Sequence, residues 1–292
     1  MNAFLFLATV LIWGTTWIAL ALQVGPVPVV VSVFYRFALA GVLFLLGLAL
    51  LGKLRVPARA QQPWILAQAL CLFSLNFLCF YTAAAYVPSG LLSIVFSLAT
   101  VFNAFNARLV FRDPITARAL LASGIGITGL TLLFGSELAV EDPMETLKGI
   151  GFAALGTLFF SLGNMVSRRN TAAGLSARDA NAWGMGYGAL FLLAVIGVTG
   201  TPMVGSSDLV YLSALLYLAV FGSIIAFTTY LMLVARIGAS QAAYATVLFP
   251  IVALTISTFA EGYEWTWIKA LGVVLALAGN AVMFSKGRPK WA

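Results

Sequence analysis

One arginine lies deep inside an apolar segment of this sequence, where a charge is costly to maintain. Arg36 stands about 11 Å in from the outer end of the apolar run 29–51, counted from Val29 at the helical rise. A buried guanidinium can bind a carboxylate through charge-assisted hydrogen bonds, so Arg36 could be the counter-charge for an anionic group of a substrate. It could instead pair with backbone carbonyls or with Glu261, and so fix two helices together.

Neutral polar residues recur near the middle of other apolar runs. Asn76, Asn103 and Asn164 carry amides, and Thr16 and Ser93 add hydroxyl groups. Lipid cannot satisfy such groups. Their donors and acceptors suit the ammonium and carboxylate of an amino acid. The alternative is hydrogen bonding between helices, which contributes about 0.6 kcal/mol per bond.

Aromatic residues make up 13% of the chain, and many stand in mid-run, as Phe77 does. A cavity lined by such rings would accept apolar and aromatic side chains and could hold an ammonium group by cation–π contact. For any single ring, plain packing or lipid contact is the alternative. Trp183, near the start of a run, could also be an anchor at the membrane interface. The aromatic residues predicted to line a substrate site are Trp13, Trp17, Tyr81, Phe96, Trp183, Tyr187, Tyr230 and Tyr244.

The interior of the apolar runs contains no acidic residue, and the sequence has no histidine. A membrane-embedded enzyme would need a base, a nucleophile or a cluster of metal ligands. We therefore expect no catalytic residues, no bound metal and no cofactor. Proton coupling through a deep carboxylate is not expected either, and only Glu261 and Glu264, near the outer edge, are candidates for it. Facilitated diffusion or exchange fits this pattern better.

Ten apolar runs position these residues. The chain is 62% hydrophobic and 9% charged, with a mean hydropathy of +1.04, whereas a soluble domain has about 25% charged residues. A spanning helix needs about 20 apolar residues, and ten such helices use most of the chain. The sequence therefore predicts an all-α polytopic membrane protein with ten transmembrane helices. The runs are roughly 3–22, 29–51, 64–86, 89–107, 117–135, 149–167, 180–199, 210–234, 239–260 and 266–285.

The segments between these runs alternate between basic and acidic. Lysine and arginine are retained in the cytoplasm during insertion, so ten crossings place both termini there, in a bacterial cytoplasmic (inner) membrane. The cations are spread over many loops, so the net charge of +7 reports topology, and we expect no nucleic-acid binding. The predicted cytoplasmic side carries Lys53, Arg55, Arg59, Arg108, Arg112, Arg118, Arg168, Arg169, Arg178, Arg236, Lys286, Arg288 and Lys290. The opposite side carries Glu137, Glu141, Asp142, Glu145, Asp208, Glu261 and Glu264, with Lys148 and Lys269.

The two halves of the chain repeat one pattern of lengths and glycines. The run 89–100 can be laid over 240–251, and 122–129 over 272–279. The second pair includes Gly124–Gly129, which matches a GxGxxG pattern. Because this pattern lies inside an apolar helix with no strand before it, it predicts close helix packing rather than nucleotide binding.

Five spans per half turn the second half upside down in the membrane. We predict a first five-helix repeat over 1–136, an acidic extracytoplasmic linker over 137–147 and a second, inverted repeat over 148–288. Inverted repeats are typical of carriers, with the substrate site between the halves near the midplane. Pro250 should kink the ninth span beside this site, as a hinge or as a static bend.

Three short motifs carry a family resemblance over nearly the whole chain. They are Trp13-Gly14-Thr15-Thr16-Trp17, Tyr35-Arg36-Phe37, and Pro250 followed by Glu261. With these motifs the chain resembles the EamA-type carriers of the drug/metabolite transporter superfamily, in particular its exporters of aromatic and other amino acids. The resemblance implies ten helices in two inverted five-helix repeats. The first half departs from the pattern, because Ala99 stands where Pro250 stands in the second, and Arg112-Asp113 lies near the expected acidic position.

These observations predict a secondary transporter that moves small zwitterionic metabolites, amino acids in particular, by alternating access. Its partners would be the small-molecule substrate and the lipid bilayer. A monomer is sufficient for the mechanism, and the oligomeric state stays open. Transport of nucleotide sugars or organophosphates is an alternative that would need several cations in the cavity. Export of cationic drugs would need a buried carboxylate, and a membrane-embedded enzyme is a third alternative.

Overall fold

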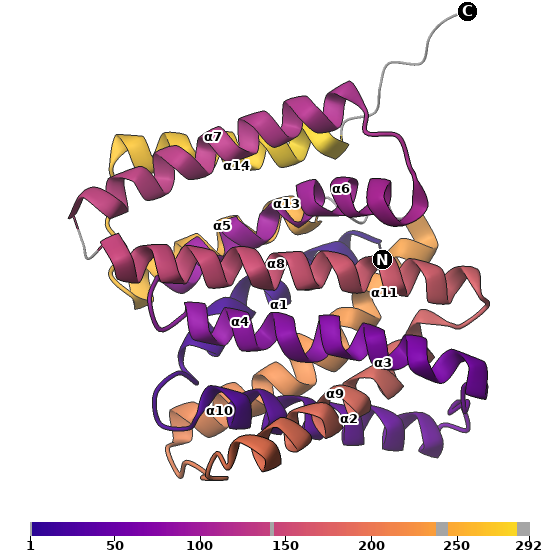
Figure 1. Ribbon diagram of the computed structural model, residues 1–292. Helices are drawn as coiled ribbons and strands as arrows, with labels where there is room; N and C mark the ends of the chain where they lie inside the picture. The colour runs from indigo at the N-terminus through magenta and orange to yellow at the C-terminus, as the bar shows by residue number, and fades with distance from the viewer. Residues whose placement is uncertain (1, 141–142, 238–244, 285–292) are drawn as a thin grey trace, which may run out of the picture.

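A computed structural model describes residues 2–140, 143–237 and 245–284, in which the regular elements are all helices joined by turns and loops, without a strand (Figure 1). The first half contains α1 (Asn2–Ala21), α2 (Val29–Leu50), η1 (Arg59–Gln61), α3 (Gln62–Leu70), η2 (Cys71–Leu75), α4 (Asn76–Ala83), α5 (Ser89–Ser97), α6 (Ala99–Phe111) and α7 (Ala117–Val140). The second half contains α8 (Pro143–Ala172), α9 (Ala177–Thr199), α10 (Leu209–Tyr217), η3 (Leu218–Ile225), α11 (Ala226–Ile237), α13 (Ala245–Ala260) and α14 (Trp267–Phe284).

Eight helical segments are long and apolar enough to cross a membrane. Two further apolar helices, Ala245–Ala260 and Trp267–Met283, are shorter than a full span within the described residues. The prediction of a polytopic helical membrane protein is thereby confirmed, and the described part of each predicted run falls mainly within a helix or a helical series. The number of ten crossings and the side on which the termini lie stay predictions.

The segment predicted as a linker, 137–147, is helical where it is described. Helix α7 continues to Val140 and α8 begins at Pro143. Alanine, leucine and glutamate in this segment favour a helix. Proline is well tolerated at the first position of a helix, where its missing N–H would have no partner. The two helices therefore extend into the predicted linker from both sides.

Helices α7 and α14 lie side by side along one edge of the bundle (Figure 1). A Cβ atom at Gly129 would lie 2.5 Å from the backbone nitrogen of Ala276 and 2.6 Å from the carbonyl oxygen of Gly272. One at Gly279 would lie 2.7 Å from the carbonyl oxygen of Ala122. The glycines thus allow backbone-to-backbone contact, as the small-residue pattern predicted. When residues 122–129 are laid over 272–279, the contact between Gly129 and Gly272 maps onto that between Gly279 and Ala122.

The third and eighth runs each contain a π-helical segment, η2 and η3. In each, a serine donates to the carbonyl five residues earlier: Ser74 to Ala69 at 3.2 Å and Ser223 to Leu218 at 2.9 Å. Ser74 also donates to the Gly188 carbonyl of α9, whereas Ser223 accepts from the Arg36 side chain of α2. π-helical turns are frequent at functional sites. The two halves therefore share this local geometry but differ in what occupies it.

The fourth run is interrupted at the place where the ninth, a continuous helix from Ala245 to Ala260, contains a proline. Pro250 lies inside α13, where it removes one helical hydrogen bond. In the first half α5 ends at Ser97 and α6 begins at Ala99, although no proline is present. The Ser97 hydroxyl donates to the Ile94 carbonyl instead, and such side-chain bonds compete with the helical pattern.

Candidate substrate cavity

A cavity of about 600 Å³ lies between the two halves of the chain. This volume falls within the range of about 300–1,000 Å³ that is typical of small-molecule sites. It is lined by residues of α1, α2, α4, α5, α6, α8, α9, α11, α13 and α14 and of both π segments. At one end the lining includes Arg168 of α8, whose side chain is 52% exposed. At the other end it includes Arg36 and Leu20, which are 2% and 3% exposed. The cavity therefore extends from an exposed mouth to a buried end.

The mouth lies at the end of the bundle where basic residues gather, which we call the basic end. The Arg168 guanidinium binds the Asp113 carboxylate there, at 2.5 Å. Arg178, at the start of α9, donates to the Lys53 carbonyl at 3.3 Å, which brings the segment after α2 to the same end. The opposite, acidic end is held by Glu261, which follows α13 and contacts the start of α5.

Arg36 occupies the buried end of the cavity. Its Nε donates to the Ser223 hydroxyl at 3.3 Å, and its Cζ lies 4.3 Å from the centre of the Phe77 ring. The Tyr81 side chain also contacts the guanidinium. The Nη1 nitrogen is buried and has no hydrogen-bond partner among the described residues. A buried charge that lacks a full set of partners is destabilising, by several kcal/mol in typical cases. Arg36 therefore retains a donor for a further acceptor.

The pairing of Arg36 with Glu261, one of the alternatives that the sequence left open, is not formed in this structure. Each Glu261 carboxylate oxygen accepts from the Ser89 backbone N–H, at 3.1 Å. One oxygen also accepts from the Ser89 hydroxyl at 2.7 Å and the Ser257 hydroxyl at 2.5 Å. The carboxylate is engaged at the acidic end because the first N–H groups of a helix attract an anion. The guanidinium instead lies against rings and hydroxyl groups of η3 and α4.

The three predicted amides all line the cavity. The Asn164 side chain donates to the Asn103 Oδ1 at 3.3 Å, which connects α8 with α6. The Asn76 Oδ1 accepts from the Phe77 backbone N–H at 2.8 Å, so its Nδ2 donors are left for another partner. The contact between Asn164 and Asn103 thus joins two helices, as expected if these amides serve helix packing. The Nδ2 donors of Asn76 remain for a solute.

Aromatic rings form most of the apolar wall. Trp17 lies at their centre, with ring centroids 5.3 Å from Phe80 and 5.5 Å from Phe96. Trp13 lies 5.0 Å from Tyr230 on the neighbouring α11. Of the predicted residues, those that line the cavity are Trp13, Thr16, Trp17, Arg36, Asn76, Phe96, Asn103, Asn164 and Tyr230. The arrangement can enclose an apolar or aromatic body with a polar group near Arg36.

Four other predicted residues lie outside this wall. The Tyr81 hydroxyl is buried behind it and donates to Gln23 Oε1 at 2.7 Å. Ser93 turns its hydroxyl back to the Gly90 carbonyl of its own helix. Trp183 and Tyr187 lie toward the basic end, where the Tyr187 hydroxyl donates to Gln62. Tyr244 lies outside the described residues.

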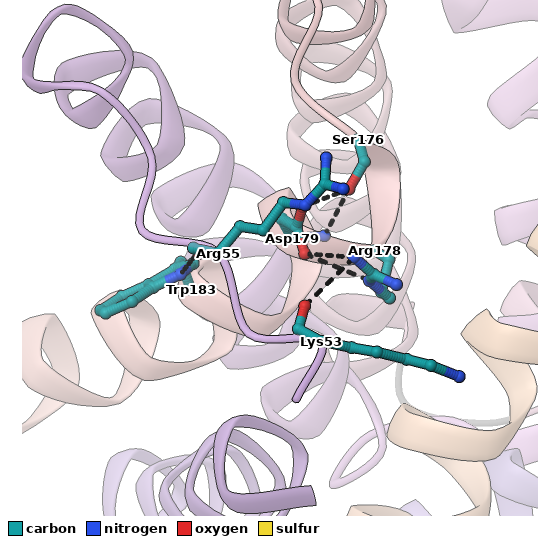
Figure 2. A network of polar contacts seen from close by, with 6 residues as sticks. All are labelled: Lys53, Arg55, Ser176, Arg178, Asp179 and Trp183. Carbon is teal, nitrogen blue, oxygen red and sulfur yellow. Dashed lines mark hydrogen bonds and ion pairs between the residues drawn. The ribbon is translucent and has the colours of Figure 1, made fainter. Parts of the chain in front are cut away.

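The surroundings of Trp183 explain its position (Figure 2). Its indole N–H donates to the Arg55 carbonyl at 2.9 Å, in the segment between α2 and α3. Nearby, the Ser176 hydroxyl accepts from the Asp179 backbone N–H at 3.1 Å and so caps α9. The Arg178 guanidinium lies between the Asp179 carboxylate and the Lys53 carbonyl. Trp183 therefore belongs to a cluster that fastens this segment to α9.

Comparison with known sequences and structures shows which family this chain belongs to. The sequence model described as "EamA-like transporter family" matches residues 1–135 and again residues 147–285. The chain belongs to the EamA-like transporter family. It is therefore a multi-pass membrane protein of the transporter class rather than an enzyme.

Individual relatives of this EamA-like transporter agree with the assignment. The uncharacterized inner membrane transporter YedA of Escherichia coli strain K12 is 27% identical, over 92% of this chain and 86% of its own length. A protein of Salmonella typhimurium named "Probable amino-acid metabolite efflux pump" is 24% identical, over 95% of this chain and 93% of its own. A solved crystal structure aligns with this chain at a TM-score of 0.67 and 18% sequence identity. The alignment covers 97% of this chain and 96% of the other, so the two proteins share a fold.

Two arginines are the charged residues among the described lining of this EamA-like transporter's cavity, Arg36 at the buried end and Arg168 at the mouth. The hydrogen bond from Arg168 holds the pKa of the exposed Asp113 carboxyl below its usual value. Asp113 itself is not in the lining. No group of three metal-ligating residues occurs in the described part of the chain. The described lining is therefore cationic, and it offers no carboxylate to a solute.

Sequence reasoning missed several lining residues of the transporter. Thr100 donates to the Asn280 Oδ1 at 2.6 Å and so connects α6 with α14 beside the cavity. Gly222 of η3 lies where an added Cβ would be 2.7 Å from the Thr16 methyl group. Asn280, the partner of Thr100, is a polar residue inside the tenth apolar run, so the sequence does carry a signal for it. Nothing in the local sequence indicated that Phe227 and Phe249 face the cavity, because phenylalanine in an apolar run also packs against other helices or lipid.

Proposed function

We propose that this EamA-like transporter exports small zwitterionic metabolites, including aromatic and apolar amino acids, across the bacterial inner membrane by alternating access. The observation that carries the proposal is Arg36, which lines the buried end of an aromatic cavity and whose buried Nη1 nitrogen has no hydrogen-bond partner among the described residues. A carboxylate fits this donor, and the rings fit an apolar side chain. The name of the Salmonella typhimurium relative is consistent with such a substrate.

Two inverted five-helix repeats, over 1–136 and 148–288, would supply the two alternating states. The two family matches over 1–135 and 147–285 support this division. So does the contact between α7 and α14, which maps onto itself when the halves are exchanged. In the state described here the mouth is at the basic end, and the Glu261–Ser89 contact holds the acidic end together. With both termini in the cytoplasm, the basic end would be the cytoplasmic one, and this state would be ready to receive a solute for export.

The test is exchange in proteoliposomes containing the full-length chain. Vesicles loaded with unlabelled phenylalanine should take up radiolabelled phenylalanine, tryptophan, methionine or threonine faster than empty vesicles do. Repeating the assay with an imposed pH gradient distinguishes exchange from proton-driven transport. Folded protein that exchanges none of these amino acids would exclude the proposed substrates.

Phosphorylated solutes are less well matched to this cavity. A nucleotide sugar or sugar phosphate carries two or more negative charges, and recognition would need several cations close together. Among the described lining, Arg36 and Arg168 lie at opposite ends. Competition by phosphate esters in the same exchange assay, without competition by amino acids, would favour that alternative.

A further inference from the structure

We propose that the cavity recognises the carboxylate of its solute and does not require an ammonium group. The substrate class then includes organic monocarboxylates with an apolar or aromatic body, such as the deaminated counterparts of apolar amino acids. This inference rests on the proposed function only in placing the solute in the cavity. It concerns which end of the solute is recognised.

The cationic end of the cavity is formed by a single side chain whose Nη1 nitrogen has no hydrogen-bond partner among the described residues. Arg36 is 2% exposed, and its Nε is taken by Ser223, while Nη1 has no partner among the described residues. The guanidinium carbon lies 4.3 Å from the centre of the Phe77 ring, a cation–π contact that helps to hold the charge in this position. A planar carboxylate fits a planar guanidinium donor closely. One negative charge on the solute would neutralise this end.

The other half of the chain provides no second cation at the corresponding place. Ser223 of η3 accepts from Arg36, whereas Ser74 of η2 donates to the Gly188 carbonyl. The repeated π-helical geometry therefore binds an arginine in one half and a backbone carbonyl in the other. A solute with one carboxylate would bind in one orientation. A dianion would keep one charge without a partner, which is costly in a buried site.

An ammonium group, in contrast, meets no carboxylate in the described lining of the cavity. Glu261 is bound by Ser89 and Ser257 at the acidic end. Asp113 is paired with Arg168 outside the lining. Only ring faces and neutral polar groups remain for the ammonium, and these also accept an uncharged or apolar group. The amino group should therefore add little to recognition.

The experiment compares four ligands that share one phenyl ring and a two-carbon chain, on the full-length chain in lipid nanodiscs, by calorimetric titration. They are phenylalanine, 3-phenylpropanoate, phenethylamine and phenylalanine amide, and empty nanodiscs correct for partition into lipid. We expect phenylalanine and 3-phenylpropanoate to bind within about tenfold of each other. We expect the two ligands without a carboxylate to bind at least about tenfold more weakly than either, from the loss of a charged hydrogen bond.

Two variants locate the effect. Arg36→Met should weaken both carboxylates by at least about tenfold while leaving the two amines unchanged, and Arg36→Lys should restore part of the carboxylate affinity. Arg108→Met is the matched control, because this exposed arginine of α6 contacts the Arg112 carbonyl outside the cavity. If Arg36→Met does not fold, the four-ligand comparison on the unmodified chain decides by itself.

The outcomes separate this inference from the proposed function. Binding of phenylalanine without measurable binding of 3-phenylpropanoate would overturn the inference and leave amino-acid export standing. If 3-phenylpropanoate bound and no amino acid did, the inference would be supported and the proposed amino-acid substrates would be excluded. Equal binding of phenethylamine and 3-phenylpropanoate, or binding of none of the four ligands to folded protein, would overturn the inference.

Discussion

The Glu261 carboxylate caps the first turn of α5 by accepting the Ser89 backbone N–H at 3.1 Å and the Ser89 hydroxyl at 2.7 Å. Glu261 belongs to the second half of the chain and Ser89 to the first. The contact therefore joins the two halves at the acidic end, opposite the mouth of the cavity. A transporter that alternates between two states would have to break it to open this end.

Replacing this carboxylate should weaken the closed acidic end. Glu261→Gln keeps the size of the side chain but loses the charge-assisted bonds, which typically contribute about 1.5–3 kcal/mol. We expect a lower apparent melting temperature and greater accessibility of a cysteine placed at the buried Leu91, in the first turn of α5, to a water-soluble thiol reagent. Glu264→Gln is the control, because its carbonyl rather than its carboxylate accepts from Lys269. Unchanged stability and accessibility in Glu261→Gln would show that the cap does not hold this end closed.

The ion pair at the mouth predicts a defined pH dependence. The hydrogen bond from Arg168 lowers the pKa of Asp113 below the usual value of 3.8. A lowered pKa means that the folded state favours the ionised carboxyl, so the contribution to stability is present above pH 3.8 and is lost as the pH falls through the lowered value. The difference in thermal stability between the unmodified chain and Asp113→Asn should therefore be present at pH 7 and vanish in acid.

A double-mutant cycle checks the partner in this ion pair. Arg168→Gln should remove the same pH-dependent difference, and the double variant should lose no more than either single one. Because both side chains are about half exposed, the total effect should be small and should decrease in high salt. If Asp113→Asn still changed the stability in a pH-dependent way in the Arg168→Gln background, the lowered pKa of Asp113 would be due to a group other than Arg168.

The packing of α7 on α14 predicts a sharp contrast between two glycines of the same helix. A Cβ at Gly129 would lie 2.5 Å from the Ala276 nitrogen, so Gly129→Ala must push the two backbones apart. We expect a loss of about 1–3 kcal/mol in stability, the usual cost of overpacking. Gly124→Ala is the control, since nothing lies within 4 Å of its added Cβ. Thermal unfolding in one detergent compares the two, and equal melting temperatures would contradict the close contact.

Two tryptophans should respond differently to the same substitution. Trp17 lies among the cavity rings, whereas Trp183 donates to the Arg55 carbonyl outside the wall. Trp17→Phe should raise the KM for an aromatic substrate several-fold, because it removes ring area that contacts the solute. Trp183→Phe should leave KM unchanged and lower stability by about 1 kcal/mol through its lost hydrogen bond. A raised KM in both variants, at matched expression, would indicate an indirect effect.

The sequence alone determined the helical elements and the kind of protein. The run predicted over 29–51 is α2, Val29–Leu50, and that over 180–199 falls within α9, Ala177–Thr199. Such runs are readable because a bilayer imposes one length and one composition on every span. The glycine pattern predicted close packing in the fifth and tenth runs for the same local reason. The short motifs identified the family.

Only the tertiary structure decided which polar residues face the cavity and which groups pair. Asn76 and Tyr81 lie five residues apart on α4, yet Asn76 lines the cavity and Tyr81 is bound to Gln23 behind the wall. A helix that is apolar all round carries no stripe that marks its inner face. Its rotation follows from contacts with several neighbouring helices, and those contacts come from residues far away in the sequence. The same reason explains why Glu261 is bound to Ser89 and Arg36 keeps a free donor, although local sequence allowed the two to pair.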